Sequence, residues 1–474
     1  MSSPLTLMVA TAVCVPAIAL AIRGSSWLVD YLFFVVALNR GVRRMIDYQN
    51  GYFDKYSLIS LTPIIVGGLA TLVVLLQLNG KQRLGRTSTN LLYLYGIAVA
   101  GAFAIGFINV RFGAVYALGE YIAPIGLIGF AAMYADTPSV LDRWCRSVAI
   151  SVAIVAAYGI YQFYTIPPWD AFWVRSVGFE GYLGTLEPTK MTLYSTMAER
   201  GPAAAYLCGG LILLILRPGT FGIFRWPMAV LVLTAMLLTY SRTTIIWAGL
   251  ALILYPLINR GTGMLPIAAI ALLAAAAGPS LMNRLPGAES VANRVSTIGS
   301  IQDDGSFKGR LILLKMALRH SVVEPLGLGI GSHGLAARVG KASRAGEGDT
   351  TGYVEILRTF GWIGFLMIVT LLYKLWKRSS DLARVELDDS NVLLFRAWFI
   401  SGMVALFSGN WMFTATFFWV LAGHCLGLYD LALDAELDTE DEYEDPDVDY
   451  SSEDLQVATL GSLFPEQPYA NSLS

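Results

Sequence analysis

Long blocks of apolar residues, separated by short charged segments, constrain this chain more than any other feature of its sequence. Each block holds about 17 to 25 residues with few charges, which is the length that a helix needs to cross roughly 30 Å of hydrocarbon. Runs such as 57–78 and 90–110 are continuously apolar, whereas the strands of a membrane barrel alternate over about 10 residues. The blocks therefore predict an all-α, polytopic membrane protein.

About 12 to 13 transmembrane helices are expected from these blocks. The second block is short and contains Asp30, so the first two could form a hairpin or one irregular unit. The first block lacks the basic segment of a secretory signal, and we expect it to remain as an anchor. Only 14% of the residues are charged, against about a quarter in soluble proteins. The candidate spans are 4–22, 26–39, 57–79, 90–110, 114–135, 147–166, 202–216, 227–240, 243–258, 263–279, 352–373, 394–409 and 411–429.

The basic residues of short loops predict the orientation, because Lys and Arg are retained on the cytoplasmic side. Placing the five basic short loops inside leaves two long loops, 167–201 and 280–351, outside. Arg40, Arg43 and Arg44 then fall on the outer side, and the rule does not explain them. The five basic loops contain Lys81, Arg83 and Arg86; Arg143 and Arg146; Arg217 and Arg225; Arg260; and Lys374, Lys377, Arg378 and Arg384.

The C-terminal segment differs in kind from the rest of the chain. From Asp430 onward it contains 14 Asp and Glu residues and no Lys or Arg, which leaves 33 basic residues against 21 acidic ones elsewhere, the chain's 35 less those 14. A segment so charged and so poor in aliphatic residues does not form a core. We expect a transmembrane domain over 1–429 and an acidic, disordered cytoplasmic tail over 430–474, which is either merely solvated or a docking segment.

Three places on the expected outer face contain residues suited to chemistry. The first is the tight connection 239–244 between two apolar blocks, with Arg242 at the membrane surface. A guanidinium offers a planar fork of donors to phosphate oxygens. Ser241 and Thr243 could cap the next helix and leave backbone N–H groups for an anion. Alternatively, Arg242 snorkels to lipid headgroups.

The second place, 309–320, predicts an amphipathic helix. At about 100° per residue, Lys308, Lys315 and Arg319 share one stripe, whereas Arg310 projects to the opposite, apolar side and needs an anionic partner there. Arg310 either snorkels out from the helix start or reaches into a site. The basic residues of this loop could also form no more than a solvated patch.

The third place is the glycine-rich segment 325–334. Its four glycines within eight residues let the backbone approach a ligand closely, but no predicted strand precedes them, so a nucleotide fingerprint is not indicated. His333 could act as a general base, since the reference pKa of histidine is about 6.5, or it could be an incidental loop histidine.

Several short motifs follow one another along the chain. They are Tyr158-Gly159-Ile160-Tyr161-Gln162-Phe163, Ser195-Thr196-Met197 with Gly201-Pro202, Tyr240-Ser241-Arg242, Gly309-Arg310, Glu324-Pro325-Leu326-Gly327-Leu328-Gly329, and Gly352-Tyr353-Val354-Glu355 with Gly361-Trp362-Ile363-Gly364. In their order and loop placement these motifs resemble those of the bacterial O-antigen ligase and polymerase family, over roughly residues 90–430.

The resemblance implies a GT-C-like helical glycosyltransferase of the bacterial inner membrane, with a periplasmic active face and neither metal nor cofactor. Its substrate would be an undecaprenyl-pyrophosphate-linked glycan. Residues at the positions of Arg242 and Arg310 would hold the pyrophosphate while an acceptor hydroxyl attacks the anomeric carbon. Membrane lipid and proteins of polysaccharide export or chain-length control are the further expected partners, and nucleic acid is not one.

The chain departs from the family at one place. Ligases carry a His-Asn pair just before the helix that opens with Tyr353, and here that stretch is Asp349-Thr350-Thr351-Gly352. The proton acceptor would be Asp349, or else Glu355 or His333, or no dedicated base is needed. We therefore expect catalytic roles for Arg242, Arg310, Asp349 and His333, and substrate-binding roles for Ser241, Arg319, Arg200, Gly329 and Tyr353.

The missing histidine favours a polysaccharide polymerase over a ligase that transfers a glycan to lipid A core or another acceptor. A flippase or transporter of lipid-linked sugars is the alternative of another class. Transport needs polar groups along a path through the membrane midplane, and Glu120 and His424 are the main ionisable residues within the spans. Arg111 could pair with Glu120 across a short outer turn.

Overall fold

Every regular element that the structure describes is a helix. The computed structural model describes residues 3–54, 57–77, 84–180, 183–197, 199–217, 221–259, 305–332, 351–384, 390–407, 409 and 415–443. The extended contact within these residues is an isolated bridge between Gly184 and Met191. The prediction of an all-α protein is confirmed.

The helices follow one another along the chain with short connections. They are α1 (Pro4–Ile22), α2 (Trp27–Asn50), η1 (Leu58–Leu61), α3 (Thr62–Gln77), α4 (Arg86–Val110), α5 (Phe112–Met133), α6 (Pro138–Thr165), α7 (Pro168–Val177), η2 (Ser195–Met197), α8 (Arg200–Leu216), η4 (Gly222–Phe224), α9 (Arg225–Leu238), α10 (Arg242–Asn259), α13 (Gly305–Val323), α15 (Gly352–Arg384), α16 (Ser390–Ala405) and α17 (Thr416–Tyr443).

Seven of the described helices are long and apolar enough to cross a membrane, which makes the chain a polytopic membrane protein. The predicted spans 202–216, 227–240, 243–258 and 394–409 correspond to four shorter apolar helices, and the predicted span 263–279 lies outside the described residues. The seven helices are Pro4–Ile22, Leu58–Gln77, Arg86–Val110, Gly113–Met133, Pro138–Thr165, Gly352–Ala383 and Thr416–Ala435.

The second predicted span, 26–39, lies in α2, a regular helix that continues to Asn50 and is not among the seven helices apolar enough to cross a membrane. The structure pairs charged residues of this helix with other parts of the chain. Near the start of α2, the buried Asp30 carboxylate accepts hydrogen bonds from Arg143 Nε at 2.9 Å and from Ser147 Oγ at 2.6 Å. A charge that is paired and hydrogen-bonded in this way can lie inside a helical bundle.

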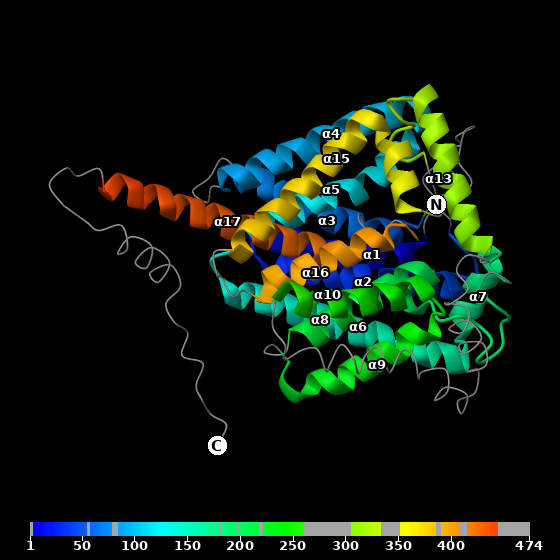
Figure 1. The fold of residues 1–474 in the computed structure, drawn as a ribbon. Helices are drawn as coiled ribbons and strands as arrows, with labels where there is room; N and C mark the ends of the chain where they lie inside the picture. Colours follow the sequence, from blue (N-terminus) through cyan, green and yellow to red (C-terminus); the bar gives the residue numbers. More distant parts are fainter. Residues whose placement is uncertain are drawn as a thin grey trace, which may run out of the picture.

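The helices lie side by side and form a bundle with two ends (Figure 1). The tail end is the end where α1 ends, α4 begins and α17 leaves the bundle, and Trp144 Nε1 donates there to the Ser26 carbonyl. The loop end is the opposite end, where α2 ends, α7 lies and α15 begins, and Leu193 N donates there to the Leu238 carbonyl. The described parts of the two long loops lie at the loop end, opposite the described parts of the basic short loops.

Glycines let the helices approach closely in the middle of the bundle. Gly423 and Gly427 of α17 are four residues apart and face the backbone of α5, where a Cβ on either would collide with the Ile128 or Ala132 carbonyl. Small residues at this spacing are typical of packed membrane helices, whose association depends on close van der Waals contact. α5 thereby becomes an interior helix, packed against α3, α4 and α17.

α17 also changes the predicted boundary of the tail. The helix continues past Asp430 to Tyr443, within the stretch expected to be disordered, and projects beyond the other helices (Figure 1). Asp430 is fixed because its carboxylate accepts hydrogen bonds from Thr87 N and Ser88 N, both at 2.9 Å, at the start of α4. The segment 444–474 lies outside the described residues.

Candidate functional site at the loop end

The connection between α9 and α10 is a tight turn at the loop end. Tyr240 has a φ of 55°, which an L-residue rarely adopts, and the Ser241 carbonyl accepts a hydrogen bond from Thr244 Oγ1 at 2.9 Å. The Ser241 hydroxyl lies 3.3 Å from Thr243 Oγ1. The backbone of Arg242 opens α10, as predicted. The turn thus presents Ser241 and the start of α10 at this end of the bundle.

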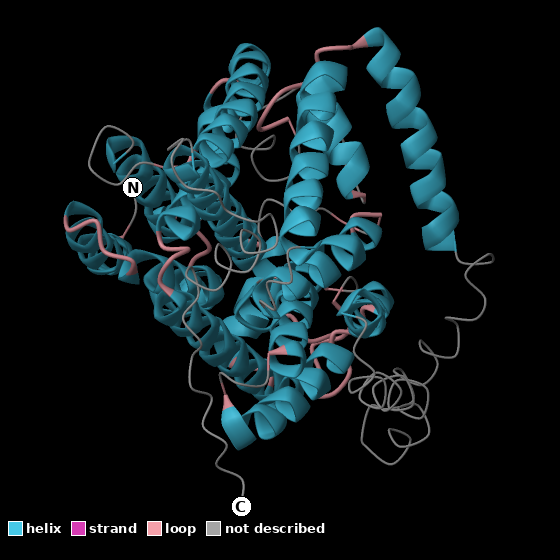
Figure 2. Cartoon of the chain, turned by 60° about the vertical axis from the view of Figure 1, so that its left-hand side comes forward, coloured by secondary structure: helices cyan, strands magenta, loops and turns pink. Residues whose placement is uncertain are grey.

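α13 lies across the loop end and stands apart from the bundle, which it contacts through α15 (Figures 1 and 2). Lys308, Lys315 and Arg319 are exposed, whereas Arg310 is half-buried and its Nε atom is buried. The predicted separation of Arg310 from the basic stripe is confirmed. The stripe is not on a purely polar face, however, because six large apolar side chains of α13 are exposed: Leu311, Ile312, Met316, Leu318, Val322 and Val323.

The described part of the glycine-rich segment, 325–332, is packed between α4 and α15. Ile330 N donates to the Ala102 carbonyl at 2.9 Å, and Gly329 N donates to the Thr359 carbonyl at 3.1 Å. Gly329 has a φ of 83°, and a Cβ there would collide with the backbone of Gly106. Close helix packing therefore accounts for the glycine that we expected to bind substrate.

α15 bends where this segment crosses it. Gly361 interrupts the helix with a φ of 62° and a ψ of −171°, and Trp362 N donates to the Pro325 carbonyl at 2.8 Å. In the first turn of α15, the Tyr353 hydroxyl donates to the Met403 carbonyl at 2.5 Å. Tyr353 thus joins α15 to α16, and its hydroxyl already has a protein partner.

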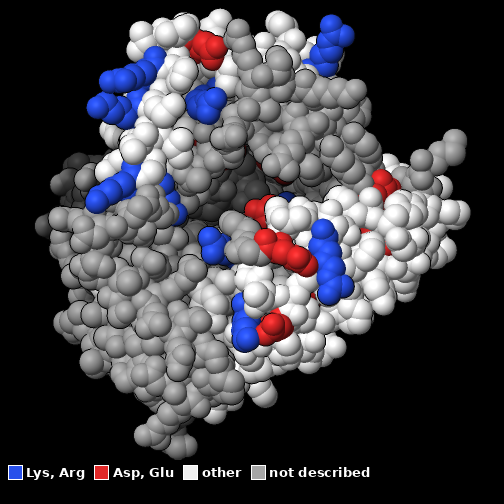
Figure 3. Space-filling view, turned by 90° about the vertical axis from the view of Figure 1, so that its right-hand side faces the viewer, with Lys and Arg blue, Asp and Glu red and all other residues white. Residues whose placement is uncertain are grey.

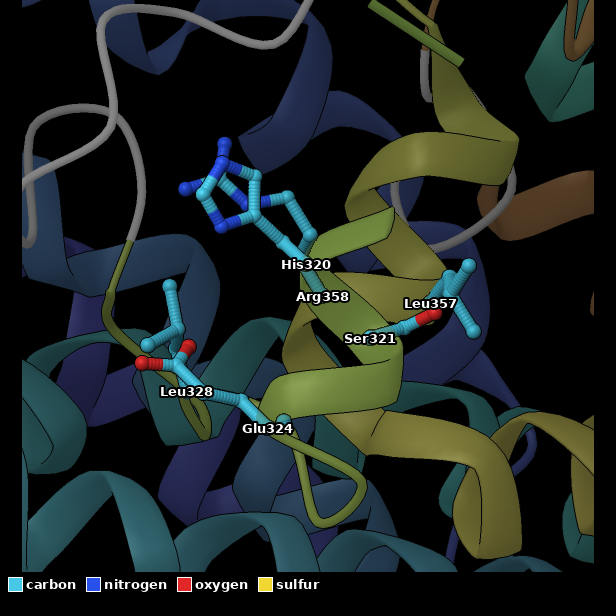
Figure 4. A pocket seen from close by; sticks show the side chains of 7 residues that line it. His320, Ser321, Glu324, Leu328, Leu357 and Arg358 are labelled. Atoms are coloured by element: carbon cyan, nitrogen blue, oxygen red, sulfur yellow. The ribbon is translucent and has the colours of Figure 1, made fainter. Parts of the chain in front are cut away.

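A small pocket opens beside the bend. It is lined by side chains from the end of α13, the glycine-rich segment and α15 (Figure 4). Two residues of opposite charge, Glu324 and Arg358, contribute to its wall together with His320. The pocket is partly open to solvent and its cavity volume is only about 30 Å³. That is far below the roughly 300 to 1,000 Å³ that ligand pockets usually have, so the pocket is too small to hold a sugar.

A buried ion pair at the loop end escaped the sequence analysis. Arg44 Nε of α2 lies 3.0 Å from Asp170 Oδ1 of α7, and both side chains are almost wholly inaccessible, at 1% and 0% exposure. The Arg44 guanidinium also donates from Nη2 to the Ser195 carbonyl at 2.5 Å and lies over the rings of Trp173 and Tyr194. This ion pair holds α7 and η2 against α2.

The motif 158–163 supplies the other partners of this carboxylate. Tyr158 OH and Gln162 Nε2 donate to Asp170 Oδ2 at 2.7 and 2.6 Å, and Gln162 Oε1 accepts from Ser195 N at 2.8 Å. Burial raises the pKa of the Tyr194 phenol, and the nearby Asp170 carboxylate raises it further. The motif is therefore a structural clamp for the first long loop in this structure.

The two arginines near Arg44 are also engaged by the protein. Arg40 Nη1 donates to the Met197 carbonyl at 3.0 Å, and Arg43 pairs with Asp47 at 3.3 Å. The three arginines near the end of α2 thus contact other segments of the protein at the loop end. They are therefore not the solvated loop charges to which the orientation rule applies. The sequence does contain a sign of these contacts. The three arginines fall on the outer side of the orientation that the five basic loops predict, where the rule does not explain them.

The loop end is hollowed near its centre, and side chains of both charges gather round the hollow (Figure 3). Glu120 of α5 and Arg40 of α2 are exposed although both helices lie inside the bundle. Arg40 is close enough to act electrostatically on Glu120. The expected partner of Glu120, Arg111, forms no ion pair with it in the described structure, and instead takes the strained φ of 47° between α4 and α5.

The remaining predicted residues are dispersed around this end. Arg200 is half-buried at the first position of α8, and Arg319 is exposed on α13. His333 and Asp349 lie outside the described residues. The described part of the chain contains no group of three His, Cys, Asp or Glu side chains placed to hold a metal ion. No protein-family model, curated protein or solved structure matches this chain.

Proposed function

We propose that this chain is a GT-C-like glycosyltransferase of the bacterial inner membrane, which polymerises undecaprenyl-pyrophosphate-linked oligosaccharide repeat units for exopolysaccharide, capsule or O-antigen. One observation carries the proposal. The turn before Arg242, the helix that bears Arg310 and the start of α15 lie at the same end of an apolar helical bundle, and this end is hollowed near its centre. A lipid-linked diphosphate could enter this end from the bilayer while its sugars stay in water.

In the proposed reaction the bond between an anomeric carbon and a diphosphate breaks, and the diphosphate leaves. Arg242 and Arg310 would bind its oxygens through their planar donor groups and stabilise the negative charge that develops as the bond breaks. The attacking hydroxyl would belong to the sugar at the end of the next repeat unit. The active face would then be periplasmic, with the tail end in the cytoplasm.

Purified protein in lipid nanodiscs, supplied with a synthetic lipid-pyrophosphate oligosaccharide, tests the proposal. We expect glycans longer than the substrate, separated by gel or mass spectrometry. Arg242→Ala and Arg310→Ala should each lower the rate about 10²- to 10³-fold, as the loss of one charge-stabilising donor does. Arg146→Ala, which removes an exposed arginine at the tail end, is the matched control and should leave the rate unchanged. A wild-type protein that never lengthens the glycan refutes the proposal.

Two alternatives give different results. A ligase that moves finished glycans to lipid A core or another acceptor would, when deleted, leave full-length chains on the carrier, whereas deletion of a polymerase leaves single repeat units. A transporter of lipid-linked sugars is favoured by one observation, the accessible Glu120 and Arg40 inside the bundle. If Glu120→Gln abolished function while Arg242→Ala and Arg310→Ala preserved it, the transport function would replace ours.

A further inference from the structure

Glu120 occupies an unusual place for a carboxylate, because it is accessible within an interior helix. Gly119 packs against Ile64 of α3, and Tyr121 packs against Phe360 of α15, with ring centroids 5.7 Å apart. From Tyr121 to Met133, no side chain of α5 is exposed. Neighbouring helices thus cover α5, and the exposed Glu120 faces a solvent-accessible space inside the bundle. It is the last exposed side chain of α5 on going from the loop end towards Met133, and the residues after it are buried or half-buried.

Arg40 is the corresponding position on α2. From Leu28 to Asn39 every side chain of this helix is buried or half-buried, and Arg40 is the first exposed residue beyond them. With a rise of about 1.5 Å per residue, Arg40 lies about 15 Å before the end of α2, and Glu120 lies about 12 Å after the start of α5. Each helix thus has its exposed ionisable residue two to three turns from its terminus at the loop end.

The surroundings of the two residues combine both charges. Arg40 acts electrostatically on Glu120, and its Nη1 atom donates to the Met197 carbonyl of η2. Glu355, from the first turn of α15, is a second carboxylate near Tyr121. Ionisable groups are costly at membrane depth, and those that persist there face water-filled cavities and serve binding or proton transfer.

We propose that Glu120 accepts the proton of the attacking sugar hydroxyl, and that Arg40 compensates the charge of this carboxylate at the floor of the hollow. The inference rests on the proposed function and supplies its base. The hydroxyl oxygen forms a bond to the anomeric carbon, and its proton passes to the Glu120 carboxylate. The bond from that carbon to the diphosphate breaks, and its electron pair leaves with undecaprenyl pyrophosphate. Glu120 then releases the proton to water.

The test measures chain growth and donor binding separately, with full-length protein in nanodiscs and the synthetic lipid-pyrophosphate oligosaccharide. Glu120→Gln should lower kcat about 10²- to 10⁴-fold, the usual contribution of a general base, while the Kd of the donor stays within about two-fold of the wild-type value. Glu120→Asp should retain part of the activity. Added formate should restore chain growth to Glu120→Ala, because a small carboxylate can take the vacated place. Glu187→Gln, an exposed carboxylate paired with Lys190, is the control and should be fully active.

The outcomes separate this inference from the proposed function. An active wild type with Glu120→Gln within about three-fold of its kcat would overturn the inference alone. A wild type that never lengthens the glycan would overturn both. If Glu120→Gln loses donor binding or fails to fold, the formate experiment on Glu120→Ala is decisive. Chain growth restored by formate supports the proton transfer, and chain growth that formate does not restore overturns it. A structural role for Glu120 would not respond to formate.

Discussion

Removing the Asp170 carboxylate should destabilise the loop end strongly. In the wild type, Arg44 and Asp170 are 1% and 0% exposed and lie 3.0 Å apart, so Asp170→Asn leaves the guanidinium buried without its counter-charge. Breaking a buried ion pair at one partner costs about 3 to 5 kcal/mol. We expect a loss of this size in the free energy of unfolding, measured by titration of SDS into mixed micelles and followed by tryptophan fluorescence, since Trp173 adjoins Arg44.

A double-mutant cycle distinguishes the ion pair from general disturbance. Arg44→Met combined with Asp170→Asn removes both charges, so the double variant should be more stable than the sum of the single losses predicts, by about 1 to 3 kcal/mol. The control is Glu180→Gln in the nearby exposed pair, where Arg175 Nε lies 3.6 Å from Glu180 Oε1, and it should change stability by less than about 1 kcal/mol. Equal effects of Asp170→Asn and Glu180→Gln, or strict additivity in the cycle, would refute the reasoning.

Three further predictions concern packing, capping and chemistry. Gly329→Ala places a Cβ against the Gly106 backbone at a φ of 83°, so it should reduce the yield of folded protein in detergent, whereas Gly309→Ala, with open space around it, should not. Asp430→Ala removes the acceptor of two N–H groups at the start of α4 and should lower the free energy of unfolding by about 1 to 2 kcal/mol, and Asp434→Ala, at an exposed position, serves as its control. Chelation with EDTA should leave chain growth unchanged, because the arginines are expected to stabilise the leaving diphosphate; a metal requirement restored by added Mg²⁺ would contradict that expectation.

The sequence predicts the spans best, because the length of an apolar helix follows from the thickness of a bilayer. It predicts their boundaries less well where charges are paired across the fold. The predicted span 26–39 ends before Arg40, whereas the helix α2 continues to Asn50, because contacts with η2 and α7 hold Arg40 and Arg44. Those partners lie more than 120 residues away and cannot be read from local patterns.

In the candidate site too, the sequence predicts the features that depend on local patterns and not those that depend on distant contacts. The helical periodicity of α13 correctly separated Arg310 from Lys308, Lys315 and Arg319. Composition alone could not reveal what the glycines of 325–332 approach, and the structure shows that they approach α4 and α15. Glu120 was noticed as an ionisable residue within a span, but its accessibility depends on which helices surround α5, a property of the assembled bundle.

The contact between Asp430 and α4 bears on how the chain reaches its final state during biosynthesis. Thr87 and its acceptor are 343 residues apart, and segments of a nascent chain fold in the order in which they are synthesised. The first turn of α4 therefore enters the bilayer long before its carboxylate exists. Until the last helix docks, those N–H groups must be satisfied by water or lipid headgroups. The start of α4 is thus completed only after α17 has been synthesised, and a chain truncated before Asp430 would present an open helix start to cellular quality control.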